Sequence, residues 1–147
     1  MTERRPRGHD DRRGPLAHLV GLAAYLVVLW ILSLIANANP ASTWSGIVAF
    51  LIATVWVVVV LTVANLLADL VLGLPFPVNL PGVLLRAVAG AGTAWYVVQI
   101  LLEVDRLYGL GVFVPLAPLA PLLYVAVFVL VLSGETLRLF TPRTPLD

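Results

Sequence analysis

The stretch that decides the fold is VWVVVVLTVANLLADLVLGLPFPVNLPGVLLR, residues 55–86. An apolar run of helical length carries three polar side chains, Thr62, Asn65 and Asp69, and is followed by a short turn that contains three prolines. Arg86 then lies near the start of a second apolar run. Because prolines stop helices and both runs are apolar enough to be solvated by lipid, the pattern predicts the middle hairpin of a small multi-pass membrane protein.

The composition extends this interpretation to the whole chain. Of 147 residues, 61% are hydrophobic and 12% are charged. Such a chain has too little polar surface to coat a water-soluble globule, so lipid must solvate most of it. A hydrocarbon core of about 30 Å needs roughly 20 apolar residues for each helical crossing. The sequence therefore predicts an all-α integral membrane protein, a bundle of four transmembrane helices.

The boundaries of these helices follow from the apolar runs and the turns between them. We expect helices over about 16–36, 44–72, 81–104 and 119–140, which together form one transmembrane domain over residues 16–140. Residues 1–15 hold five arginines and three acids and predict a flexible basic tail, and residues 141–147 predict a short C-terminal tail. Residues 105–121 contain three regularly spaced prolines and predict an apolar linker, or alternatively a segment that dips back into the membrane.

Charge distribution predicts the orientation in the membrane. With four crossings, both termini and the turn before Arg86 lie on one side. That side holds eight arginines: Arg4, Arg5, Arg7, Arg12, Arg13, Arg86, Arg138 and Arg143. The other side holds only Arg106, next to two acids. Since positively charged loops stay on the cytoplasmic side, both termini are expected to be cytoplasmic.

A first group of polar residues lies at the cytoplasmic end of the middle hairpin. Asp69 and Arg86 are joined by a short, stiff turn, and Asn65 lies one helical turn before Asp69. Asn65, Asp69 and Arg86 are thus a candidate clasp of the hairpin. The alternative is an ion or proton site in which Asp69 titrates and Asn65 is a further ligand. The position near the helix end, where charges reach water, favours the structural role.

A second group lies on the outer half of the predicted third helix. Tyr96, Gln99, Glu103 and Arg106 share one face, roughly opposite the face that carries Arg86. A single chain of four helices can bury one polar face of the third helix in its interior. We therefore expect the second polar face to contact a partner. Glu103 and Arg106 are also expected to pair with each other.

The sequence lacks the residues that several classes of function require. There is no cysteine, and the motifs of zinc proteases, serine hydrolases and P-loop nucleotide-binding proteins are missing. Haem ligation by two histidines fails because His9 lies in the tail and His18 near the membrane surface. We therefore expect no enzymatic activity, no cofactor and no metal. A net charge of +1 gives no general attraction to nucleic acid.

The sequence favours a small non-enzymatic membrane protein that is a structural or accessory subunit of a membrane assembly. Its expected partners are the lipid bilayer and either further copies of itself or other membrane proteins. The alternative is a homo-oligomeric channel or transporter with a polar path through Asn65, Asp69 and Glu103. Nine arginines without a lysine are typical of a high-GC prokaryotic genome, which suggests the plasma membrane of a prokaryote.

Overall fold

The computed structural model describes residues 13–75 and 77–140. Over these residues the chain forms helices and no strand, which confirms the all-α class. Four of the helices are long and apolar enough to cross a membrane, as the sequence predicts. Most of the predicted N-terminal tail and all of the C-terminal tail lie outside the described residues, although Arg13 to Pro15 already belong to the first helix.

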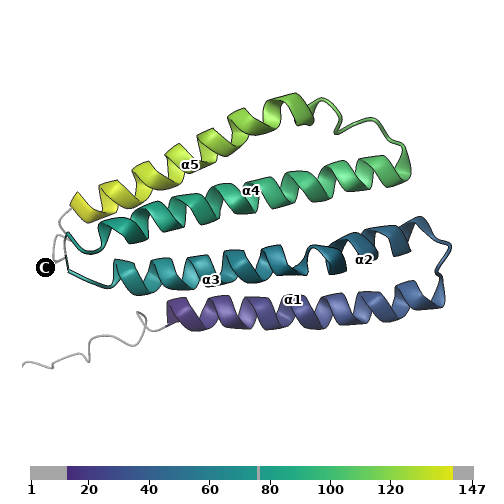
Figure 1. Cartoon of the computed structure of the whole chain (residues 1–147), viewed down its shortest axis with the longest axis horizontal. Coiled ribbons are helices and arrows are strands. Elements are labelled where there is room, and N and C mark those ends of the chain that lie inside the picture. Colours follow the sequence, from purple (N-terminus) through teal and green to yellow (C-terminus); the bar gives the residue numbers. More distant parts are fainter. Residues whose placement is uncertain (1–12, 76, 141–147) are drawn as a thin grey trace, which may run out of the picture.

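The helices follow one another in chain order across the molecule (Figure 1). Helix α1 (Arg13–Ala38) borders α2 (Thr43–Ala53) and α3 (Val55–Leu72), and α3 borders α4 (Leu80–Tyr108). Helix α5 (Leu116–Phe140) packs against α4 alone among the described elements. The start of α1, the α3–α4 turn and the end of α5 lie at one end of the molecule, here named the clasp end, and the 109–115 loop lies at the other end, the loop end (Figure 1).

The predicted second helix, 44–72, is interrupted at Thr54. This residue ends α2 and precedes α3, with φ −102° and ψ 6°. Its hydroxyl donates a hydrogen bond to the carbonyl oxygen of Phe50 at 2.8 Å, a backbone contact that bends helices at threonine. Five valines within the next six residues add β-branched crowding on the α3 side. The expectation of one continuous tilted helix is therefore corrected to two helices that meet at Thr54.

Helix α4 is the central element and is longer than predicted. Pro81 lies in its first turn, where a missing N–H costs nothing. The helix continues through Tyr108 and ends at Gly109, which has the left-handed conformation with φ 64°. Asp105, expected in a linker, is a buried residue of α4, and its Oδ1 accepts a hydrogen bond from the Val112 N–H at 2.9 Å. This bond holds the loop against the end of α4.

Helix α5 begins before the predicted position because prolines are tolerated in a first helical turn. Residues 116–118, which lie before the predicted helix, are helical, so the connection between α4 and α5 shrinks to residues 109–115. Pro121 lies inside α5 and cannot donate to the carbonyl of Ala117. Helix α5 diverges from α4 toward the loop end (Figure 1).

Close packing concentrates on small residues, as lipid-exposed bundles require. Ala68 of α3 and Ala87 of α4 are completely buried, and Ala89 is 1% exposed. Large apolar side chains point outward instead, among them Leu122 and Leu130, each 71% exposed. The molecule therefore has a thin core, in which alanines lie beside larger apolar side chains such as Val48 and Val57, and an apolar exterior.

Gly82 provides a test of this close approach between α3 and α4. A Cβ at Gly82 would lie 3.0 Å from the backbone nitrogen of Leu72 and 3.1 Å from the carbonyl oxygen of Ala68, neither of which can yield without moving the helix. We expect Gly82→Ala to lower the free energy of unfolding, although alanine favours a helix over glycine by about 1 kcal/mol. The measurement is unfolding in mixed detergent micelles.

Gly134→Ala in α5 is the matched control, since nothing lies within 4 Å of the added Cβ. It should leave stability unchanged or raise it by up to about 1 kcal/mol. Equal effects of the two substitutions would contradict the proposed tight contact at Gly82.

Candidate functional site

The carboxylate of Asp69 contacts two other helices at the clasp end. Arg86 Nη1 of α4 donates to Oδ1 at 2.9 Å, and His18 Nε2 of α1 lies 3.0 Å from Oδ2. Because an ionised carboxylate only accepts hydrogen bonds, His18 Nε2 must carry the hydrogen in this contact. Each oxygen of Asp69 therefore has its own partner.

Glu135 of α5 joins this group through Arg86. The distance from Arg86 Nε to Glu135 Oε1 is 3.5 Å, and Arg138 Nη1 lies 3.4 Å from the same oxygen. The resulting group, here named the clasp cluster, contains His18, Asp69, Arg86, Glu135 and Arg138 and connects all four long helices. The cluster thus holds two carboxylates, two guanidinium groups and one imidazole.

The exposed fraction of the side chains differs among the members of the clasp cluster. The side chains of Asp69 and Glu135 are 15% exposed, those of His18 and Arg86 about twice as much, and that of Arg138 is 77% exposed. Charges this far from water must be paired, because an unpaired charge in a poorly hydrated site is costly. Arg86 lies between both acids and is thus the centre of the cluster, while Arg138 lies at its rim.

Helix dipoles add to the need for this pairing. Asp69 lies in the last turn of α3, where the negative end of the dipole disfavours an anion. Arg86 lies in the second turn of α4, beyond the first turn in which the dipole acts, and gains no stabilisation from the N-terminal half of its own helix. Neither charge is stabilised by its own helix, so each depends on the other across the turn.

The structure brings together two of the three residues of the predicted clasp. Asp69 and Arg86 are in contact, whereas Asn65 Nδ2 donates to the carbonyl oxygen of Leu61 at 2.9 Å, within its own helix. His18 was expected as an interfacial side chain, and its bond to Asp69 was not foreseen. The contact of Glu135 with Arg86 was not foreseen either.

The predicted partner-facing group is divided by the structure. Tyr96 is 7% exposed and lies inside the molecule, where its hydroxyl is 3.3 Å from that of Tyr25 and 3.1 Å from Thr54 Oγ1. The expected pair of Glu103 and Arg106 is present, with Nε to Oε2 at 2.9 Å. Among the described residues, Gln99 has no side-chain hydrogen bond.

The three hydroxyls around Tyr96 form an ordered chain. Thr54 uses its single proton on the carbonyl of Phe50, so it accepts a hydrogen bond from Tyr96, and Tyr96 in turn accepts one from Tyr25. One hydroxyl comes from α1, one from the α2–α3 junction and one from α4. These hydrogen bonds thus link the α2–α3 junction at Thr54 to α1 and α4.

The clasp cluster fits ion pairing between helices. In the described part of the chain, no three histidine, aspartate or glutamate side chains lie together in a way that holds a metal ion. Comparisons of this sequence with protein-family models, and of the chain with curated proteins and solved structures, give no match.

Arg86 should matter more for stability than any other cation of the cluster. We expect Arg86→Gln to lower the free energy of unfolding by about 2 kcal/mol, because it leaves Asp69 and Glu135 without their shared partner. The same substitution at the exposed rim, Arg138→Gln, should cost no more than about 0.5 kcal/mol. Unfolding in mixed micelles compares the two variants, and similar losses would show that Arg86 is not the centre.

Proposed function

We propose that this chain is a small non-enzymatic membrane protein that acts as a structural or accessory subunit of a membrane assembly. The observation that carries the proposal is Gln99, a polar side chain in a membrane-spanning helix with no hydrogen-bonding partner among the described residues. The expected partner is a further copy of the chain or another membrane protein.

An unpaired glutamine is unfavourable in a membrane. Its amide carries two donors and one acceptor, and leaving such a group unpaired away from water costs about 1–3 kcal/mol. Four other polar side chains of the helices avoid this cost by bonding to a carbonyl oxygen one turn earlier: Thr62 to Val58, Asn65 to Leu61, Thr93 to Ala89, and Thr136 to Leu132. Gln99 has no such bond, so a donor or acceptor from a neighbouring protein would stabilise it.

The surroundings of Gln99 support a contact surface. Trp95 lies one turn before it on the same side of α4 and is 40% exposed. Arg106, two turns further on, has a side chain that is 70% exposed even though it pairs with Glu103. Aromatic and arginine side chains are enriched at protein interfaces, and glutamine associates helices within membranes. The outer half of α4 is therefore the proposed contact.

Orientation and location complete the proposal. The clasp end carries Arg86 and Arg138, and the loop end carries Arg106, in line with the count of eight arginines against one. The clasp end and both termini are proposed to face the cytoplasm, with the four helices forming a bundle in the plasma membrane of a prokaryote.

The channel or transporter alternative has less support. Its polar path requires Asn65, Asp69 and Glu103 to act along one line. In the structure Asn65 bonds to its own helix, Asp69 to His18 and Arg86, and Glu103 to Arg106. These separate partners favour structural roles for all three residues.

Substitution of Gln99 tests the proposed contact. We expect Gln99→Leu to weaken assembly in mild detergent about 3–20-fold, the range found for hydrogen bonds between membrane helices. Native mass spectrometry of protein purified in mild detergent gives the fraction of assembled species. Thr93→Val is the matched control on the same helix, because Thr93 bonds only to the Ala89 carbonyl and should leave assembly unchanged.

A monomeric wild-type protein without companions, or unchanged assembly of Gln99→Leu, would contradict the proposal. Ion or solute flux through liposomes that depends on Asp69, tested with Asp69→Asn, would favour the transporter instead.

A further inference from the structure

One face of α4 stays open along most of the helix. Six of its residues fall within a sector of about 60°, and none of the six is buried. They are Leu84, Val88, Trp95, Gln99, Leu102 and Arg106, here named the open face. In its outer half the residues follow one another at alternating steps of four and three, the spacing of a helix that packs along a second, parallel helix.

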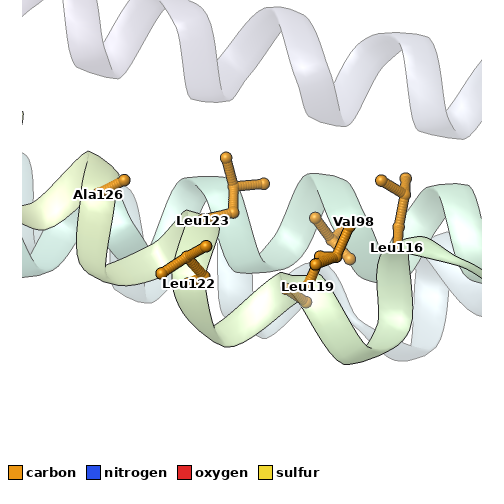
Figure 2. Close-up of a pocket in the computed structure, with 7 residues that line it drawn as sticks. Val98, Leu116, Leu119, Leu122, Leu123 and Ala126 are labelled. Atoms are coloured by element: carbon orange, nitrogen blue, oxygen red, sulfur yellow. The ribbon is translucent and has the colours of Figure 1, made fainter.

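The side of α4 next to the open face offers Gln99 no hydrogen-bonding partner. Val98, the preceding residue, is 3% exposed and lines an apolar groove of about 360 Å³ between α4 and α5 (Figure 2). The other residues around this groove are leucines and alanines of α5, and no polar side chain lines it. The Gln99 amide thus finds neither a donor nor an acceptor on α5.

We propose that the open face binds the open face of a second copy of this chain, with Gln99 opposite the partner's Gln99. This inference rests on the proposed function, because it names the partner of that same contact. Two copies take the same orientation in a membrane, since each carries the same distribution of arginines. A two-fold axis along the membrane normal therefore brings each residue opposite its own copy at the same depth.

The amide of Gln99 is complementary to itself. It carries two donors and one acceptor, so two facing amides exchange two hydrogen bonds. A different protein would have to present a polar group at this particular depth, whereas a second copy does so by symmetry. A single polar residue within such a helical seam also fixes the register and the number of chains.

The charges at the outer end of the open face are complementary in the same way. The side chain of Arg106 is 70% exposed and that of Glu103 beside it is 18% exposed, and Arg106 Nε donates to Glu103 Oε2 at 2.9 Å. Around a two-fold axis, two guanidinium groups and two carboxylates alternate, so each arginine lies near two carboxylates and the net charge is zero. The contact thus places opposite charges, and not like charges, against each other.

Disulfide crosslinking of the purified full chain in liposomes tests the geometry. The chain has no cysteine, so Leu102→Cys creates its only thiol while Gln99 stays in place. The matched control is Val97→Cys, because Val97 is 49% exposed on the same helix and points about 140° away from Leu102. With copper phenanthroline as oxidant, we expect the thiol at position 102 to form linked dimers at least about tenfold faster than the thiol at position 97.

Charge reversal tests the partner. Arg106→Glu leaves only acids at positions 103 and 106, and Glu103→Arg leaves only arginines, so each variant should repel its own copy and lose dimer about tenfold. A mixture of the two variants should restore the dimer to within about twofold of wild type. Differently sized tags identify the mixed dimer in mild detergent, and its formation shows that both variants fold.

Equal crosslinking at positions 102 and 97 would show random collisions and overturn the proposal. So would a mixture of the two charge variants that does not form dimers. A purified chain that is monomeric, but copurifies with another membrane protein only when Gln99 is present, would overturn the second copy as partner and leave the proposed function standing. Absence of both kinds of assembly would contradict the proposed function as well.

Discussion

The ion pair between Asp69 and Arg86 is the contact on which the arrangement of the helices depends. Asp69 lies in the last turn of α3, where the helix dipole disfavours an anion, and its side chain is only 15% exposed, so an unpaired charge there is costly. Pairing with Arg86 across the α3–α4 turn removes this cost, and His18 and Glu135 contact the same pair from α1 and α5. Helix α1 borders only α2 and α3, and α5 borders only α4 within the described chain, so the cluster gives these outer helices a shared polar anchor.

Packing changes from one end of the molecule to the other. At the clasp end, Gly82, Ala68 and Ala87 allow close backbone approach beside the paired charges. At the loop end α5 diverges from α4, an apolar groove opens, and Gln99 has no partner among the described residues. Charged groups at the clasp end are thus paired with one another, but the Oδ1 atom of Asn79 in the α3–α4 turn is buried there without a hydrogen-bond partner among the described residues.

The sequence predicts the parts of this structure that depend on local patterns. Four long apolar runs give four long helices, and the short turn between Asp69 and Arg86 correctly suggests their contact. Contacts between distant segments are harder to predict from the sequence. His18 and Glu135 reach the clasp cluster only because of how α1 and α5 pack. Tyr96 shares a helical face with Gln99 but lies inside, because the interruption at Thr54 supplies a hydroxyl partner that helical periodicity does not reveal.

The most direct test of this account is a double-mutant cycle on Asp69→Asn and Arg86→Gln, with the free energy of unfolding measured in mixed micelles for each single variant and for the pair. If the two residues hold each other, the cycle should give a coupling energy of about 1–3 kcal/mol. Losses that add to within about 0.5 kcal/mol would show that the residues act independently and would contradict the central role of this ion pair.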